Sequence, residues 1–447
     1  MNTKTSVNPF LRVEQCLIVD LKPYKKNSKI HDKKQVKQIA ASIKEFGFNV
    51  PILIDGENNI IAGHGRVLAC KELGIEEIPT ISIEHLSDTQ KRAFLIADNK
   101  LTENAEWDKE MLALEFKELG ELDLSFDLDI TGFSINDIDF IIGEDTAAEG
   151  EEENLEEILQ ASEDLPVVTK SGNIWILGRH KLMCGDSRDT ENYKQLMGNL
   201  KADMVVGDPP YNVKLGATNK DRKPSIHKPF AMGYGEMSEE EYTEFLAGIF
   251  KNLAEYSKDG SIHYVFINWR NMYAMHNAGR QHYTELKNIC VWNKPNAGMG
   301  TFYRSKYGLV FVFKNGDEPH INNFGLGEDG RFRTNVWDYP SATSFFQDPV
   351  TGESRNDLMK MHPTVLPVSI FIDMMLDCSK PGSLVLDPFN GSGTSIIAAE
   401  KTGRKLYGME YEPKFVDAAI RRWQAFTGKE VVCAETKKTF NKIQNGN

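Results

Sequence analysis

The sequence lacks the features that would place the protein in a membrane or outside the cell. No apolar run reaches the ~18 residues that a membrane span needs, so no membrane partner is expected. The segment from Met1 to Thr5 lacks the apolar core of a signal peptide. The six cysteines are scattered and include no Cys-x-x-Cys pair. Their spacing argues against a zinc site or a disulfide framework and favours the reducing cytoplasm.

Positive charge is also scarce, with 52 Lys and Arg against 65 Asp and Glu and a net charge of −13. Nucleic-acid-binding proteins are often basic, so the overall charge argues against such a partner unless the acidic residues are concentrated in one part of the chain. Residues 144–164 alone hold ten acidic side chains and no Lys or Arg. Residues 214–306, by contrast, hold thirteen Lys or Arg against nine Asp or Glu. Because a duplex meets a local surface and not the average, nucleic acid is not excluded.

The N-terminal part predicts a small mixed α/β domain. Apolar residues at helical spacing predict a helix over residues 36–46 that ends at Gly47. Two short apolar runs around Asp55-Gly56 predict a hairpin, and the helix that follows is closed by Gly74. The other expected elements are a strand at 17–19, helical residues over 88–120, and a short helix near 133 capped by Ser134 or Asn136. The acidic run after them predicts a solvated tether.

From Gly172 onward, apolar strands alternate with amphipathic helices. The clearest predicted strands lie at 204–206, 264–267, 309–313, 384–386 and 406–408. This alternation predicts an α/β domain with a mostly parallel sheet covered by helices on both faces. Ligands of open α/β sheets bind at the carboxyl ends of the strands, so the loops at those ends are the candidate sites.

Two of these loops carry distinctive chemistry. The first is Asp208-Pro209-Pro210-Tyr211, and the second is Asp387-Pro388-Phe389-Asn390-Gly391-Ser392-Gly393-Thr394. Glycines let the second loop turn tightly and approach a ligand closely. Glu410 ends another predicted strand 23 residues after Asp387, where a carboxylate can accept hydrogen bonds from ribose hydroxyls. A nicotinamide-nucleotide site is disfavoured because the spacing departs from G-x-G-x-x-G, and a P-loop is disfavoured because no Lys-Ser or Lys-Thr follows the glycines.

The first loop resembles the catalytic loop of amino-group DNA methyltransferases, and the second resembles their S-adenosylmethionine loop. Because the catalytic loop comes first, the order resembles the beta class of that family. The resemblance implies a Rossmann-like methyltransferase with S-adenosylmethionine as cofactor and double-stranded DNA as substrate. Phe389 and Gly391 would flank the methionine portion, Glu410 would hold the ribose, and Asp186 would reach the adenine. The full set of implied cofactor-binding residues is Asp387, Phe389, Gly391, Gly393, Thr394, Glu410, Asp186 and His362. A capping role at a turn is the alternative for Asp186.

The implied catalytic residues are Asp208, Pro209, Pro210 and Tyr211. An exocyclic amino nitrogen attacks poorly because its lone pair is delocalised into the base. Asp208 and the carbonyl of Pro209 can accept hydrogen bonds from its two N–H groups, and the two prolines stiffen the turn. Tyr211 can stack on an extruded base, a contact worth ~1–3 kcal/mol. No metal is implied.

Adenine N6 is favoured over cytosine N4, because the family associates Asp at the first position of this loop mainly with adenine. Protein glutamine methylation is disfavoured, since that family carries Asn-Pro-Pro-Tyr after its cofactor loop. Two departures leave open a DNA-binding regulator with a degenerate methylase half. Tyr307-Gly308 stands where relatives usually have His-Glu, and Leu366 stands where they usually have Lys. Target recognition is expected within about 214–350, with DNA contacts from the Lys214–Lys228 cluster, Trp292-Asn293-Lys294 and Tyr303–Lys306.

Gly63-His64-Gly65-Arg66 resembles the phosphate loop of ParB and sulfiredoxin-like domains, and it predicts a nucleotide or phosphate partner. His64 stands at the sulfiredoxin cysteine position, and nuclease or nucleotide hydrolysis by this module stays open. Chains that join these two parts resemble proteins of phages and mobile elements. The expected parts are a ParB-like domain (12–105), a helical extension (106–142), an acidic linker (143–166), the methyltransferase domain (167–430) and a C-terminal tail (431–447). Whether the protein is a monomer or a homodimer, and whether it has a restriction partner, also stays open.

Overall fold

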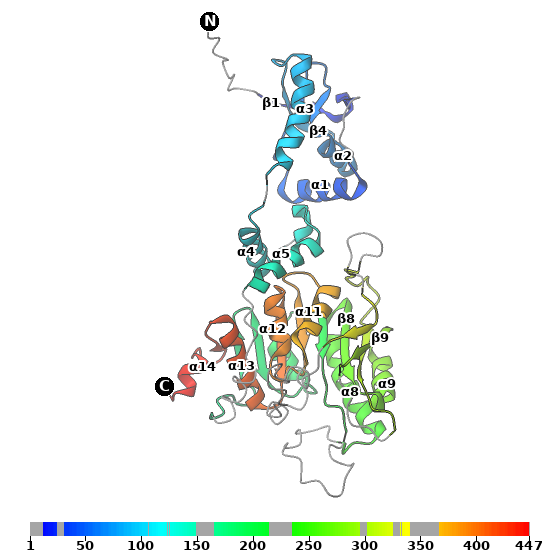
Figure 1. Ribbon diagram of the computed structural model, residues 1–447, viewed down its shortest axis with the longest axis vertical. Helices are drawn as coiled ribbons and strands as arrows, with labels where there is room; N and C mark the ends of the chain where they lie inside the picture. Colours follow the sequence, from blue (N-terminus) through cyan, green and yellow to red (C-terminus); the bar gives the residue numbers. More distant parts are fainter. Residues whose placement is uncertain are drawn as a thin grey trace. The chain divides into compact units, whose positions relative to one another are not determined.

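The computed structural model describes residues 12–24, 31–105, 107–122, 124, 126–148, 165–213, 235–295, 302–324, 331, 333–339 and 366–446 (Figure 1). The chain divides into two compact units. The first holds Met1–Leu112 and Leu124–Asp137, and the second holds Ala113–Asp123 and Ile138–Asn447. Within the described residues, no helix is both long enough and apolar enough to cross a membrane.

The first unit contains a four-stranded sheet in the order β1-β4-β2-β3. Its strands are β1 (Val13–Leu17), β2 (Ile52–Ile54), β3 (Ile60–Ala62) and β4 (Glu77–Ser82), and its helices include α1 (Lys33–Phe46), α2 (His64–Leu73) and α3 (Asp88–Glu103). The predicted helix ending at Gly47, the hairpin and the helix closed by Gly74 are confirmed. The strand expected at 17–19 is wrong beyond Leu17, because Ile18–Asp20 forms a 3₁₀ turn. Ile18 and Leu21, three residues apart, are both buried, a spacing that suits such a turn.

The helical stretch expected over 88–120 is two helices, α3 and α4 (Lys109–Glu121). A second start signal explains the break, because the Asp108 carboxylate accepts a hydrogen bond from the Met111 amide at 3.1 Å. Ser134 begins α5 (Ile135–Ala148), and its hydroxyl accepts a bond from the Asp137 amide at 3.2 Å. Of the two caps considered, Ser134 is therefore the one used. Helix α5 covers the start of the expected acidic linker, and residues 149–164 lie outside the described part.

The second unit is built on a ten-stranded sheet in the order β11-β9-β10-β8-β7-β12-β13-β6-β5-β14. The central strands β6, β13, β12, β7 and β8 are parallel, and antiparallel pairs flank them on both sides. The strands are β5 (Ile174–Leu177), β6 (His180–Cys184), β7 (Ala202–Gly207), β8 (Ser257–Ile267), β9 (Glu285–Asn293), β10 (Tyr307–Lys314), β11 (Val336–Asp338), β12 (Leu384–Asp387), β13 (Lys405–Glu410) and β14 (Val432–Cys433). The sheet is thus mixed, with a parallel centre at the position of the two loops.

Helices cover both faces of this sheet, as the alternation of strands and helices predicted (Figure 1). One buried cluster joins the sheet to α7 (Thr190–Met197), α8 (Glu239–Glu255) and α9 (Met272–His282). The other joins it to α11 (Val368–Cys378), α12 (Thr394–Lys401) and α13 (Pro413–Thr427). Residues 431–447, set apart as a tail in the sequence, supply β14 and α14 (Phe440–Gln444), and the Phe440 ring contacts buried Trp175 edge-on.

A buried ion pair ties α5 to the ten-stranded sheet within the second unit. The Arg404 side chain has no exposed surface, and its guanidinium donates to both carboxylate oxygens of Asp139. It also donates to the carbonyl of Ser379 at 2.9 Å and to the carbonyl of Thr402 at 2.7 Å. Because a buried cation needs such partners, this contact makes α5 part of the core of the second unit.

Candidate active site at the carboxyl edge of the sheet

The carboxyl ends of β6, β13, β12, β7 and β8 lie along one edge of the sheet, since these strands are parallel. Strand β10 runs the other way, so its first residue, Tyr307, lies at the same edge, opposite Asn293 at the end of β9. We call this side the carboxyl edge. Both loops singled out in the sequence follow strands that end here.

The two loops touch each other. Strands β7 and β12 are neighbours, with Met204 opposite Val385. A Cβ atom added to Gly207, just before Asp208, would lie 3.5 Å from atoms of both Pro388 and Phe389, which is ordinary van der Waals contact. Segments about 180 residues apart in the sequence are therefore brought into one site.

Hydrogen bonds fix the Asp208–Tyr211 loop. The Tyr211 hydroxyl donates to Oδ1 of Asp208. The Tyr242 hydroxyl of α8 donates to the carbonyl of Pro210 at 2.7 Å, and the side-chain amide of Asn271 donates to the carbonyl of Tyr211. The loop backbone is held from two neighbouring elements, so its acceptors have a defined direction.

The Asp208 carboxyl is electrostatically unusual. Burial raises its pKa to about 7, and the Asp387 carboxylate acts in the same direction. The Tyr211 hydrogen bond and the Lys294 ammonium oppose that rise. Burial in turn lowers the pKa of Lys294, whose Nζ lies 4.4 Å from the centre of the Trp292 ring. A perturbed acid at a strand end is a common mark of a functional site.

The second loop turns sharply between β12 and α12. Gly391 and Gly393 have φ angles of 55° and 86°, a region that glycine enters without strain. A Cβ on Gly393 would lie 2.9 Å from Cβ of Ala419, so α13 packs directly on the turn. Asp387 accepts bonds from the Phe389 amide, at 2.9 Å, and from the Ser395 hydroxyl. Burial raises the pKa of Asp387 to about 6.

Glu410 faces this loop from the end of β13. Its two carboxylate oxygens accept bonds from the Gly391 amide at 2.9 Å and the Glu412 amide at 2.8 Å. Burial raises the pKa of Glu410 to about 7. Nearby, Asn390 is buried, and no group in the described residues donates to its Oδ1. A buried acceptor without a donor marks a place where a ligand can donate.

Asp186 lies beside Glu410, because the Gly185 amide donates to the Glu410 carbonyl at 2.9 Å. Its carboxylate is paired with Arg188 at 2.6 Å. Burial acts to raise the pKa of Asp186, but the bonds from Arg188 outweigh it and lower the pKa. The Thr394 hydroxyl accepts from Arg422 at 2.9 Å and is buried below the turn. His362 and Lys214–Lys228 lie outside the described residues.

The two departures from the family pattern are accommodated by the packing. Leu366 is buried in the core beside α11. A Cβ on Gly308 would lie 3.4 Å from the Trp292 ring and 3.9 Å from Cε of Lys294. A side chain at this position would therefore fit in ordinary contact beside Trp292 and Lys294, the lysine whose charge acts on Asp208. Among the described residues, no cluster of three or more His, Cys, Asp or Glu is arranged to hold a metal ion.

Sequence reasoning missed three residues that hold the Asp208–Tyr211 loop, namely Tyr242, Asn268 and Asn271. The segment Asn268-Trp269-Arg270-Asn271 directly follows the strand predicted at 264–267, so its location at a strand end was a usable signal. Tyr242 lies on a helix face, and no pattern in the sequence connects it to the Pro210 carbonyl.

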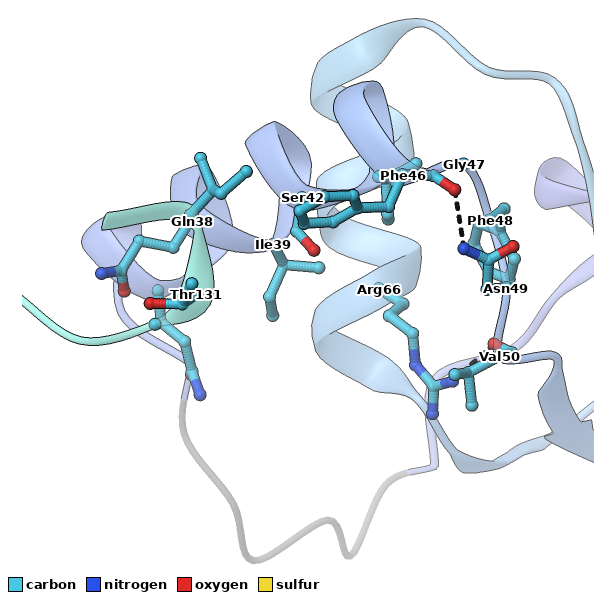
Figure 2. A pocket seen from close by; sticks show the side chains of 14 residues that line it. Gln38, Ile39, Ser42, Phe46, Gly47, Phe48, Asn49, Val50, Arg66 and Thr131 are labelled. Carbon is cyan, nitrogen blue, oxygen red and sulfur yellow. Dashed lines mark hydrogen bonds between the residues drawn. The ribbon is translucent and has the colours of Figure 1, made fainter. Parts of the chain in front are cut away.

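In the first unit, Gly63 begins α2 in the left-handed region with a φ of 102°. Arg66 donates to the carbonyl of Val50 and lines a cavity of about 560 Å³ with residues of α1 and Ile130–Gly132 (Figure 2). Two of the lining residues are joined by a hydrogen bond, which the side-chain amide of Asn49 donates to the Phe46 carbonyl at 2.6 Å (Figure 2). Because Arg66 is engaged with backbone carbonyls, nucleotide or phosphate binding by this loop stays a prediction.

Comparisons with known proteins match different parts of the chain to different families. A family model described as DNA methylase matches residues 202–421 and spans both loops. The chain contains a DNA methylase domain. Models of the ParB N-terminal domain and of the ParB-methyltransferase HTH domain match residues 9–100 and 110–170 of this methylase. The last match covers α4, α5 and the acidic run.

Individual relatives cover the two parts separately. The methylase is 25% identical over 235 residues to the type II methyltransferase M2.MboI of Moraxella bovis, covering 50% of this chain and 81% of that protein. Its N-terminal part is 45% identical over 73 residues to the ParB-like nuclease domain-containing protein YnaK of Escherichia coli K12, covering 16% of this chain and 84% of that one. The solved structure of PvuII DNA methyltransferase, described as cytosine-N4-specific, matches at 16% identity and a TM-score of 0.41, covering 64% of this chain and 97% of that chain.

Proposed function

We propose that this DNA methylase transfers the methyl group of S-adenosylmethionine to N6 of an adenine extruded from double-stranded DNA. The observation that carries the proposal is the contact between the two loops. Asp208 directly follows Gly207, which ends β7 beside Pro388 and Phe389, so an acceptor for an amino group lies next to a glycine turn suited to the cofactor. This arrangement lets one site hold both reactants, which is how positioning accelerates a two-substrate reaction.

The residues at the second loop fit S-adenosylmethionine. Glu410 presents a carboxylate to the turn, where it can accept from ribose hydroxyls, and the Oδ1 of Asn390 lacks a donor within the described residues. Gly391 leaves the backbone of the turn open to close approach, whereas Gly393 makes room for α13. When bound, the cofactor supplies an electrophilic methyl group on its sulfonium. Phe389 and Gly391 would flank its methionine portion, and Asp186 would serve its adenine after release from Arg188.

The first loop would act on the target base. Ionised Asp208 accepts one N–H of the amino group, and the carbonyl of Pro209 accepts the other, which favours a more nucleophilic nitrogen. Tyr211 stacks on the base and offsets part of the few kcal/mol that extrusion costs. Lys294 lies near Asp208, and its positive charge keeps more of this carboxyl ionised at neutral pH.

Asp208 also supports adenine as the target. By its resemblance to the family, Asp at the first loop position is associated mainly with adenine and Ser mainly with cytosine. Cytosine N4 is the alternative target of the same geometry, since both reactions place an exocyclic amino group at the same acceptors.

Mass spectrometry of nucleosides, after incubation of the protein with mixed-sequence duplex and methyl-labelled cofactor, tests the proposal. Labelled N6-methyl-2′-deoxyadenosine is the expected product, and labelled N4-methyl-2′-deoxycytidine would show that cytosine is the target base instead. Asp208→Ala should abolish the label and keep cofactor binding, whereas Glu244→Gln, an exposed control on α8, should leave it unchanged. Label absent from DNA while the protein binds cofactor would reject the proposal and favour a degenerate scaffold.

A further inference from the structure

Exposed aromatic side chains of the second unit gather at the carboxyl edge. In the described part of this unit, the exposed large aromatic side chains other than Phe140 all belong to residues within six positions of a strand end at that edge. They are Trp269 and Tyr273 after β8, Phe302, Tyr303 and Tyr307 at the start of β10, and Tyr411 after β13. Exposed aromatic side chains concentrated around a candidate site point to a binding surface.

One of these segments is connected directly to the catalytic loop. The residues after β8 form the 3₁₀ turn η3 (Trp269–Asn271), capped by Asn268, whose Oδ1 accepts from the Asn271 amide at 3.1 Å. The side-chain amides of Asn268 and Asn271 both donate to the carbonyl of Tyr211. A displacement of this turn would therefore move Tyr211, the residue that would stack on the target base.

The same turn presents its other side chains to solvent. Trp269 is 46% exposed and Tyr273, in the first turn of α9, is 65% exposed. The guanidinium of Arg270 lies 4.8 Å from the centre of the Trp269 ring, which orients that ring beside a cation. Rings next to a positive charge suit a nucleic-acid strand, because bases stack on aromatic faces and phosphates pair with Arg.

We propose that η3 and the start of α9 are a DNA-contacting element, in which Trp269 and Tyr273 pack against the strand beside the extruded base and Asn271 positions Tyr211. The inference rests on the proposed function for its choice of partner. Extrusion leaves an unstacked gap whose neighbouring bases need new contacts, and an exposed ring at the carboxyl edge can supply one. Trp269 and Tyr273 are thus binding residues, and Asn271 is a positioning residue.

The binding role of Trp269 and the positioning role of Asn271 predict different kinetic effects. Trp269→Ala should weaken duplex binding and raise KM for DNA by ~10-fold, the range that stacking of one base implies. Trp269→Phe, which keeps a ring, should restore most of the affinity. Asn271→Ala should lower the single-turnover rate at saturating DNA by ~10-fold while leaving the Kd for DNA unchanged.

Leu200→Ala provides the matched control. Leu200 is an exposed apolar residue that precedes β7, so it lies at the opposite edge of the sheet. The full chain is used, with a fluorescein-labelled duplex, and the Kd for cofactor reports that each variant is folded. If Trp269→Ala does not fold, Tyr273→Ala, on the more exposed ring, takes its place.

The inference is supported when the Trp269→Ala protein binds cofactor normally, binds duplex more weakly than Leu200→Ala, and is rescued by Trp269→Phe. It is overturned when Trp269→Ala and Leu200→Ala bind duplex equally well, or when Asn271→Ala changes only the Kd. Failure of the proposed function gives a different result. If duplex binding depends on Trp269 but no base becomes methylated, the DNA-contacting element is supported and the proposed methyltransferase activity is rejected.

Discussion

The hydroxyl of Tyr211 donates a hydrogen bond to Oδ1 of Asp208, so the residue expected to stack on a base already uses one of the two carboxylate oxygens proposed to accept from that base. An ionised carboxylate can accept several hydrogen bonds, so the amino group of the base can donate to Oδ2 or compete with the hydroxyl for Oδ1. The Tyr211 hydroxyl and the target base therefore share the acceptor capacity of Asp208.

Tyr211→Phe tests this relationship. The variant keeps the stacking ring but removes the competing hydroxyl, together with a hydrogen bond that holds the pKa of Asp208 down. We expect the pH at half-maximal rate to rise by roughly one unit, since a charge-assisted hydrogen bond is worth about 1.5–3 kcal/mol. At high pH the rate should equal or exceed that of the unaltered protein. Single-turnover rates measured across pH check this, and a midpoint that stays or falls would contradict it.

In the unaltered protein, the methylation rate should fall as pH decreases below about 7, which gives the pH–rate profile an acid limb. Burial raises the pKa of Asp208 to about 7, and only the ionised carboxylate accepts freely, so the rate should rise as pH increases through that value. Lys294→Met removes a positive charge that lowers this pKa and should move the limb to higher pH. Rates are measured at saturating cofactor and DNA. A limb that moves to lower pH in Lys294→Met would show that another group titrates.

Cofactor affinity should depend on Glu410 and on pH. Glu410→Gln should weaken S-adenosylmethionine binding by ~10–100-fold, the effect of losing hydrogen bonds to a charged acceptor. Because the pKa of Glu410 is raised to about 7, affinity in the unaltered protein should increase as pH rises through 7. Titration calorimetry checks both. The exposed control Glu430→Gln should bind normally, and an unchanged Kd in Glu410→Gln would remove Glu410 from the site.

The buried pair of Asp139 and Arg404 should dominate the stability of the α5 contact. Asp139→Ala leaves a fully buried guanidinium without its carboxylate and should lower the free energy of unfolding of the second unit by about 3–5 kcal/mol. Glu191→Ala breaks an exposed pair with Lys194 in the same unit and should cost less than about 1 kcal/mol. Urea denaturation followed by circular dichroism compares the two. Equal losses would show that the buried pair has no special weight.

Local patterns were sufficient to predict much of the fold. The strands that end at Gly207, Asp387 and Glu410 are short apolar runs followed by turn residues. Each such run can be predicted from its own local sequence. Their meeting at one edge follows from parallel order. The strand expected at 17–19 was wrong because burial of both Ile18 and Leu21 decided the local turn, a tertiary preference that periodicity does not reveal.

The contacts that hold the site were not accessible from the sequence. Asp139 and Arg404 are 265 residues apart, and neither lies in a motif. The bond from Asn271 to Tyr211 depends on how η3 turns after β8, and the bond from Tyr242 to Pro210 depends on the rotation of α8. The sequence pointed to the loops that we propose carry the chemistry, whereas the residues that orient them depend on packing.

Sequencing of base modifications in DNA from a methylation-deficient host tests the central claim most directly, because it reads base and sequence context together. Cells that express the unaltered protein should carry N6-methyladenine at one recurring sequence, and cells that express Asp208→Ala should carry none. Unmodified DNA in both, or the same modification in both, would contradict the account.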